Sequence, residues 1–374
     1  MPVTLRKAET RGQLNEFVRF PVDLYRGNPF YVPSLSFDEL DTLDPGKYPA
    51  FEFCEAVYFI AERDGKAVGR IAGIINRRYI EKWGNKYARF GWIDFVEDIE
   101  VARTLLGAVE DWARERGMDG LHGPLGFTDL DREGMLVEGF DRRATMITIY
   151  NHPYYPEYLE RLGYAKDCDW VEYLIRIPKE VPEKIRRVVE LLGKRTGVRL
   201  YPWKTRKELI SKFGKQFFAL LDEAYVGLYG TTALSERQVA MYVEQNLGFV
   251  DPRFTKLLVD EKDELIGFGL AMPNLSRPLQ ASRGRVLPFG WLRILAALRS
   301  PKLLDLYLIA VKAEYQSRGV VAIIMSAINK SAVDAGIEYA ESNPELEENL
   351  AVQGLWKDTE RTMHKRRRVY LKRL

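Results

Sequence analysis

The chain has 374 residues, enough for two ordinary domains, and its 46% hydrophobic and 29% charged residues are typical of a globular protein. No stretch reaches the roughly 18 apolar residues that span a bilayer, and the polar N-terminus lacks a signal-peptide core, so we expect a cytoplasmic protein. Two cysteines and three scattered histidines exclude a disulfide framework and argue against a metal site, and a net charge of +3 gives no reason to expect nucleic-acid binding.

The first half of the sequence predicts alternating strands and helices. In chain order we expect a strand over 3–5, a helix over 11–25, a hairpin over 57–76, a strand over 90–96, a helix over 99–116 and a short strand over 118–124. The hairpin consists of two apolar runs around the charged turn Asp64-Gly65-Lys66, and Gly117 is placed to end the helix.

The second half predicts the same elements in the same order. We expect a strand over 198–201, a helix over 206–225, a hairpin over 255–274, a strand over 303–311, a helix over 318–335 and a strand over 337–344. The two hairpins superimpose without a gap, with Gly69 on Gly267 and Asn76 on Asn274. We therefore interpret the chain as a duplicated α/β unit, in which each copy is a mixed twisted sheet flanked by helices.

The ends of the two halves are less regular. The polar, proline-containing stretch 177–184 predicts the boundary between an N-terminal domain of residues 1–178 and a C-terminal domain of residues 179–374. The last segment, 364–374, predicts an edge strand with a basic rim.

One loop of the second half has the chemistry of a diphosphate site. The strand that ends at Val311 is followed by 316–321, QSRGVV, and then directly by an apolar helix. Backbone N–H groups at a helix start, together with the helix dipole, attract an anion. Gly319 lets the anion approach the backbone closely, and Arg318 adds a positive charge.

This loop resembles the Q/R-x-x-G-x-G/A loop with which the GNAT superfamily, the acyl-CoA N-acyltransferases, binds coenzyme A. Val321 departs from the glycine or alanine usual at the last position. The equivalent first-half segment, 96–102, has three acidic residues and neither a glycine nor a basic residue, so we expect a degenerate N-terminal copy that does not bind CoA. The CoA contacts are expected from the following residues: Ala310, Val311, Gln316, Ser317, Arg318, Gly319, Val320, Val321 and Asn349.

The resemblance extends over nearly the whole chain. Segments 123–141, 151–164 and 341–349 look like those of bacterial tandem GNAT proteins, some of which join long acyl chains to sphingoid-type amines. The resemblance therefore implies two fused acyl-CoA N-acyltransferase folds, acetyl-CoA or a longer acyl-CoA as co-substrate, and a small-molecule or lipid-like amine as acceptor.

Acyl transfer to an amine needs a base for the amine and a proton for the leaving thiolate. Glu341, at the end of a predicted strand, is the first candidate for the base and Glu347 the second; a solvated acidic cap on the following helix is the structural alternative for Glu347. Trp356 stands where many GNAT proteins have a tyrosine acid, which leaves Tyr307, Tyr339 or water as the proton source.

Two segments could form the acceptor site. The insertion 275–304 has six basic residues, no acidic residue and a helical apolar stripe that includes Trp291, so it is either a packed helix with a solvated basic face or a lid that shelters an acyl chain or contacts an anionic membrane. Asn151, Tyr154 and Tyr155 lie in a proline-stiffened loop of the first half and could line a cleft between the halves.

We therefore predict a metal-independent acyl-CoA-dependent N-acyltransferase, monomeric or homodimeric. Two alternatives remain open from the sequence: a CoA-binding sensor or scaffold without catalysis, and a tandem GNAT protein that transfers aminoacyl groups from tRNA. The intact loop 316–321 argues against the second alternative, since those transferases do not need it.

Overall fold

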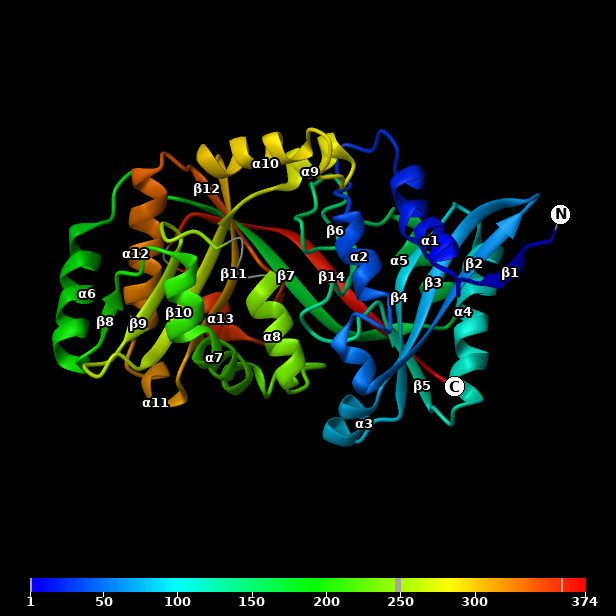
Figure 1. Cartoon of the computed structure of the whole chain (residues 1–374), viewed down its shortest axis with the longest axis horizontal. Helices are drawn as coiled ribbons and strands as arrows, with labels where there is room; N and C mark the ends of the chain where they lie inside the picture. The colour runs from blue at the N-terminus through cyan, green and yellow to red at the C-terminus, as the bar shows by residue number, and fades with distance from the viewer. Residues whose placement is uncertain (1, 246–249, 358) are drawn as a thin grey trace.

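The computed structural model describes residues 2–245, 250–357 and 359–374. Within these ranges all fourteen strands belong to one mixed sheet, which runs through the long axis of the molecule (Figure 1). Helices cover both faces, as the sequence predicts. None of the helices in the described part of the chain has the length and apolar character needed to cross a membrane.

The first half of the chain supplies one end of the sheet. Its elements are β1 (Thr4–Lys7), α1 (Arg11–Leu24), α2 (Ser36–Thr42), η1 (Pro49–Glu52), β2 (Cys54–Arg63), β3 (Lys66–Asn76), α3 (Arg77–Trp83), β4 (Tyr87–Phe95), α4 (Ile99–Arg114), β5 (Gly120–Gly123), β6 (Met135–Glu138), α5 (Tyr154–Arg161) and β7 (Ala165–Arg176). The apolar stripe of α4 packs on one face of β2–β5, and Phe17 and Val18 of α1 pack on the other. Gly117 takes φ +71° just beyond α4, which explains why the helix ends there.

The second half repeats this arrangement after the connection 177–182. Its elements are α6 (Glu183–Thr196), β8 (Arg199–Tyr201), α7 (Arg206–Tyr225), α8 (Glu236–Gln245), β9 (Thr255–Val259), β10 (Leu265–Pro273), α9 (Ser276–Ser282), α10 (Gly290–Arg299), β11 (Leu303–Val311), α11 (Ala313–Gln316), α12 (Val321–Asp334), β12 (Tyr339–Ser342), β13 (Glu345–Leu346), α13 (Leu350–Gln353), η3 (Gly354–Trp356) and β14 (Arg361–Arg373). Helices α12 and α7 take the places of α4 and α1 on the two faces.

The register of the strands confirms the duplication. Gly69 of β3 pairs with Phe95 of β4, and the equivalent Gly267 of β10 pairs with Val311 of β11. In both pairs the later strand, β4 or β11, carries one extra residue near its middle, which forms a β-bulge. The bulge of β4 lies opposite Arg70 to Ala72 of β3, and the bulge of β11 lies opposite Leu270 and Ala271 of β10. A bulge bends its strand, so β4 and β11 are deflected at equivalent points.

The two halves exchange their last strands. The sheet order is β1-β2-β3-β4-β5-β14-β7-β12-β11-β10-β9-β8, with β6 beside β14 and β13 beside β7. Strand β14, from the end of the chain, therefore lies between β7 on one side and β5 and β6 of the first half on the other. Strand β7, from the first half, lies between β14 on one side and β12 and β13 of the second half on the other. The sequence boundary at 178 falls in the connection after β7, but neither sheet region is completed by its own half of the sequence.

The expectation of a basic edge strand at the C-terminus is wrong. Strand β14 lies in the middle of the sheet, where it pairs with β7 along most of its length and with β5 and β6 on its other side. Lys365 and Arg367 are fully buried there and form ion pairs with Glu172 of β7. The basic residues therefore neutralise buried carboxylates of the neighbouring strand instead of facing solvent.

Candidate active site

The strands β11 and β12 separate in the middle of the second half. Their parallel pairing runs only from Leu303 opposite Tyr339 to Leu306 opposite Ser342. Beyond that point β11 bulges at Tyr307, and its next carbonyls accept hydrogen bonds from side chains: Ile309 from the Tyr225 hydroxyl at 3.3 Å and Val311 from Gln316 Nε2 at 3.0 Å. The edge of β11 from Tyr307 to Val311, on the side away from β10, thus has no strand partner among the described residues, and we call it the open edge.

The loop after β11 presents free backbone N–H groups. Gly319 has φ +74°, a conformation that glycine adopts without strain, and α12 begins two residues later. No side chain caps α12, and the N–H groups of Gly319 and Val320 have no acceptor within the described part of the chain. Arg318 is exposed and packs over the ring of Tyr315. This is the arrangement that binds an anion at a helix start.

The equivalent space in the first half is closed. Asp98 caps α4 by accepting the Glu100 N–H at 2.9 Å, and it also pairs with Arg63. The gap beyond β4 is filled by Tyr155, whose hydroxyl accepts the Phe95 N–H at 2.7 Å and donates to the Phe95 carbonyl at 3.1 Å. The carboxylate thus occupies the start of α4, whereas the start of α12 has no side-chain cap, and the tyrosine fills the space beyond β4.

A cavity of about 1980 Å³ extends from the open edge of β11 into the first half. Drug-sized ligands usually occupy roughly 300–1,000 Å³, so this space accommodates two substrates side by side. Of the residues predicted to contact CoA, those that line the cavity are Ala310, Val311, Gln316, Gly319, Val321 and Asn349. Ser317, Arg318 and Val320 belong to the same loop but do not line it.

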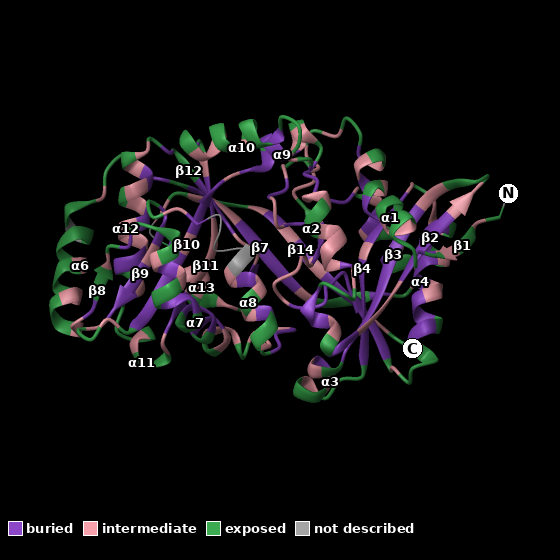
Figure 2. Cartoon of the chain, viewed as in Figure 1, coloured by how far each residue is buried: buried purple, intermediate pink, exposed green. Residues whose placement is uncertain are grey.

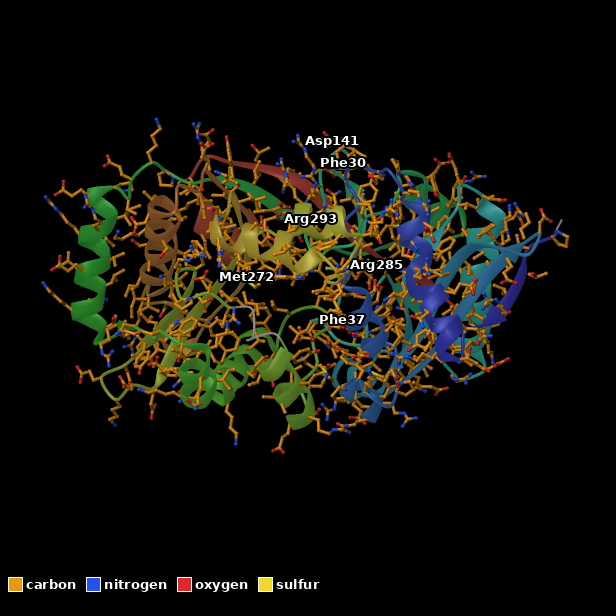
Figure 3. All side chains as sticks on the ribbon, turned by 45° about the horizontal axis from the view of Figure 1, so that its top comes forward. Phe30, Phe37, Asp141, Met272, Arg285 and Arg293 are labelled. Carbon is orange, nitrogen blue, oxygen red and sulfur yellow. The ribbon has the colours of Figure 1, made fainter. Side chains whose placement is uncertain are left out.

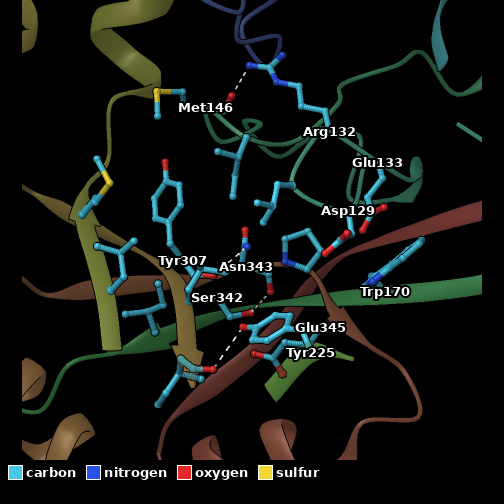
Figure 4. Close-up of a pocket in the computed structure, with 18 of the residues that line it drawn as sticks. Asp129, Arg132, Glu133, Met146, Trp170, Tyr225, Tyr307, Ser342, Asn343 and Glu345 are labelled. Carbon is cyan, nitrogen blue, oxygen red and sulfur yellow. Dashed lines mark hydrogen bonds between the residues drawn. The ribbon is translucent and has the colours of Figure 1, made fainter. Parts of the chain in front are cut away.

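A buried carboxyl group faces this cavity at the split. Glu345, in β13, is only 8% exposed and lines the cavity close to Tyr225 and Ser342 (Figure 4). Burial raises the pKa of Glu345 to about 7, and the hydrogen bond from Trp356 Nε1 to its Oε1, at 2.7 Å, limits this rise. Its Oε2 is buried without a hydrogen-bond partner among the described residues. A carboxyl group with a pKa near neutrality is suited to take up a proton at physiological pH.

Glu341, the first candidate for the base, lies elsewhere. It is buried next to β7 and β14, forms an ion pair with Lys365, and does not line the cavity. The positive charge of Lys365 offsets the cost of burial and lowers the pKa of Glu341. Glu172, Glu341 and His364 lie close enough to share a metal ion, but the Lys365 ammonium already contacts both carboxylates, so this cluster is an ion-pair network.

Glu347, the second candidate for the base, is partly exposed. It pairs with Lys166 and, at 2.9 Å, with Arg366, and it does not line the cavity. Glu347 therefore belongs to surface ion pairs, and it does not cap the following helix, because Asn349 caps α13 with its own side chain.

Two tyrosines line the cavity near Glu345. Tyr307 extends from the bulge of β11 into the cavity, and Tyr225 approaches from the end of α7 (Figure 4). Burial raises the pKa of both, that of Tyr225 to about 12. Tyr339, the other predicted proton source, is exposed at the start of β12 and does not line the cavity.

The predicted acceptor residues have mostly internal roles. Asn151 lines the cavity, but its side chain is engaged with the backbone of Leu136. Its Oδ1 accepts the Leu136 N–H at 2.7 Å, and its Nδ2 donates to the Leu136 carbonyl at 3.0 Å. Tyr155 lines the cavity with its hydroxyl engaged at Phe95, and Tyr154 donates to the same carbonyl at 2.7 Å. Trp291 lies on the outer face of α10 and is exposed.

An acidic wall of the cavity was not anticipated from the sequence. Asp129, Asp131 and Glu133 follow β5 and line the first-half side, where Figure 4 shows Asp129 and Glu133 near Trp170. Burial raises the pKa of all three, that of Asp131 to about 6. The run DLDRE at 129–133 was the only signal available, and acidic runs of this kind are common in exposed loops.

Comparisons with known proteins agree with this architecture. No family model matches the chain. Over 377 aligned residues the chain is 28% identical to a bacterial ceramide synthase of Caulobacter vibrioides, with 98% of this chain and 96% of that protein covered. It is 24% identical over 371 residues to protein YghO of Escherichia coli, with 97% and 94% covered.

Solved structures reproduce the fold. A tandem GNAT protein from the clavulanic acid biosynthesis pathway superimposes with a TM-score of 0.55 at 12% sequence identity, and the match covers 99% of this chain and 98% of that one. The duplicated order of strands and helices is therefore shared from end to end, and the chain has the fold of a tandem GNAT protein.

Proposed function

We propose that this protein is an N-acyltransferase that moves an acyl group from coenzyme A to the amino group of a lipid-like acceptor. The observation that carries the proposal is the alignment of three features along one cavity: the free α12 N-terminus, the open edge of β11 and the carboxyl group of Glu345. The first suits a diphosphate, the second suits the amide-containing arm of CoA, and the third suits an amine.

The residues divide the chemistry as follows. Gly319, which lines the cavity at the start of α12, holds the diphosphate through its backbone N–H group, and the backbone of β11 beyond Tyr307 holds the pantetheine amides. Glu345 takes the proton from the amine as its nitrogen attacks the thioester carbon. The carbon–sulfur bond then breaks, and the leaving thiolate receives a proton from the Tyr307 hydroxyl, which water re-protonates.

Two observations favour a long-chain amine as acceptor. The cavity is lined on the first-half side by apolar residues such as Met135, Ile147 and Ile149, next to the acidic wall. A protonated amine on an apolar chain complements both surfaces. The similarity to a bacterial ceramide synthase over almost the entire chain points to the same class, an amine of the sphingoid type.

The test measures release of free CoA thiol with purified full-length protein. We expect turnover with palmitoyl-CoA and a sphingoid base, and a loss of about 10²–10⁴-fold in kcat for Glu345→Gln, with Glu348→Gln as the exposed control. Binding of CoA without thiol release for any amine would contradict the proposal and favour a CoA sensor.

The location of CoA is tested separately. Gly319→Ala forces an alanine into a left-handed conformation beside the diphosphate, so we expect weaker CoA binding. The matched change in the first half, Asp98→Ala, removes the cap of α4 and should cost about 1 kcal/mol of stability without changing the CoA dissociation constant. Equal effects of the two variants on CoA binding would contradict the assignment to the second half.

A further inference from the structure

We propose that the outer face of residues 283–299, the loop and helix α10 of the insertion, docks on an anionic membrane surface. The proposal deepens the proposed function, since it names the place from which a lipid-like acceptor reaches the cavity. The docking itself does not depend on catalysis and is tested without it.

Helix α10 has apolar residues on both faces. Ile294, Ala297 and Leu298 pack inward against the first half. Trp291 and Leu292 are nevertheless 46% and 47% exposed, although the exposed positions of a helix are normally polar. Figure 2 shows α10 largely exposed along the upper edge of the molecule.

The loop before α10 continues this apolar surface. Leu287 and Phe289 leave 74% and 69% of their surface exposed, and Leu295 adds a further exposed side chain on the helix. Five large apolar residues within nine positions form a surface that a monomeric protein rarely leaves to water.

Basic residues surround this apolar surface. The exposed ones are Arg277, Arg283, Arg285, Arg293, Arg299 and Lys302, and residues 275–304 include no acidic side chain. The insertion thus carries six positive charges while the whole chain carries +3, so the remainder of the chain is net negative. Basic residues around exposed tryptophan, phenylalanine and leucine are the composition of helices that lie in the interface of an anionic bilayer.

Charge and shape favour a membrane over other occupants. A second copy of the chain would place the same six positive charges against one another in a two-fold interface, which repels. A nucleic acid would match the charge but would leave Leu287, Leu292 and Leu295 against phosphates. A bilayer interface satisfies both properties, because apolar side chains enter the acyl boundary while arginines remain at the headgroups.

Hydrogen bonds attach the insertion to the first half of the chain, and the insertion connects the docking face to the cavity. Gln280 Nε2 donates to the carbonyls of Pro29 and Tyr31, and the Ser36 N–H donates to the Gly284 carbonyl. A Cβ at Gly284 would lie 2.0 Å from the Ser34 carbonyl oxygen, so this contact requires glycine.

The inner side of the same insertion, Leu275, Leu279 and Ile294, lines the cavity. Figure 3 shows Arg285 and Arg293 on the insertion together with Met272 and Phe37, cavity-lining residues from the two halves. A lipid drawn from a bilayer at the outer face would thus reach the cavity by passing one layer of helices.

The experiment is co-sedimentation of the full-length protein with vesicles of phosphatidylcholine, with and without phosphatidylglycerol. We expect binding to the anionic vesicles that weakens with salt, and little binding to phosphatidylcholine alone. Arg285→Gln combined with Arg293→Gln should weaken binding about 30-fold, since each basic residue near an anionic surface contributes about a factor of five. Lys207→Gln, an exposed change on α7, should have no such effect.

The apolar contribution has its own variant and control. Leu287→Ser combined with Phe289→Ser should weaken vesicle binding, whereas Val226→Ser, at another exposed apolar position, should not. Equal binding to neutral and anionic vesicles, or equal loss for the patch and control variants, would overturn the proposal. So would a dimer in solution that Leu287→Ser dissociates. Glu345→Gln should bind vesicles normally, so a failed activity assay does not affect this result.

Discussion

The indole nitrogen of Trp356 donates a hydrogen bond to Glu345 Oε1 at 2.7 Å, and the second oxygen of this carboxyl group has no partner in the described part of the chain. The resemblance to GNAT proteins leads us to expect a tyrosine acid at the position of Trp356. Trp356 cannot supply a proton, but it stabilises the charged form of the carboxyl group that we propose as the base. The tryptophan is thus a positioning residue for Glu345.

Replacing Trp356 should therefore change the pH dependence of catalysis. Trp356→Phe removes a hydrogen bond to the ionised carboxylate, which raises the pKa of Glu345 from about 7 by roughly one unit. Activity depends on the ionised form, so the ascending limb of the kcat/KM profile should move to higher pH, and the rate should recover at alkaline pH. A profile of unchanged midpoint with a uniformly lower rate would indicate a packing role only.

Glu345 should also lower stability at alkaline pH. Its pKa in the folded protein, about 7, is raised above the ordinary value of 4.5, so the folded state favours the protonated form. The associated stability is fully present below pH 4.5 and is lost as the pH rises through 7. Glu345→Gln should therefore match the unmutated protein at about pH 4 and exceed it by roughly 1–3 kcal/mol at pH 8 in urea unfolding. Glu348→Gln should show no pH-dependent gain in the free energy of unfolding. An equal gain for Glu348→Gln would show that the gain comes from removing any surface charge and not from the burial of Glu345.

The buried ion network should be necessary for the exchanged strands. Lys365 of β14 contacts Glu172 of β7 and Glu341 of β12, so it joins the two halves at the centre of the sheet. Lys365→Met leaves Glu341 without its main counter-charge, and we expect a loss of roughly 3–5 kcal/mol in the free energy of unfolding. Lys330→Met, which breaks an exposed pair with Asp334, should cost at most about 0.5 kcal/mol. A loss below about 1 kcal/mol for Lys365→Met would show that the network is dispensable.

The length of the acyl chain should matter through the inner side of the insertion. If the cavity shelters the chain, each buried methylene contributes about 0.8 kcal/mol, and affinity should rise steeply from acetyl- to palmitoyl-CoA. Ile294→Ser, at the cavity wall, should weaken palmitoyl-CoA more than acetyl-CoA, whereas Leu295→Ser, on the outer face, should leave this preference unchanged. Equal dissociation constants for both thioesters with the unmutated protein would contradict a long-chain site.

The sequence by itself determined the repeated elements and the position of the loop 316–321, which we propose as the CoA site. The hairpins, the helix 206–225 and the strand 303–311 follow from local apolar periodicity, which depends on residues close together in the chain. The bulge at Tyr307 and the open edge of β11 form the rest of the proposed CoA site beside Gly319. They arise from pairing between strands, so no local pattern in the sequence predicts them.

Only the tertiary structure decided which carboxyl groups meet the cavity and which are neutralised. Glu341 and Glu345 are four residues apart and alike in sequence, yet one contacts Lys365 from the far end of the chain and the other contacts Trp356 beside an open space. The exchange of β7 and β14 produces this difference, because it brings buried cations against Glu341 and leaves Glu345 at the split. Pairing of strands almost 200 residues apart is set by the packing of the whole sheet, so no local spacing in the sequence could reveal it.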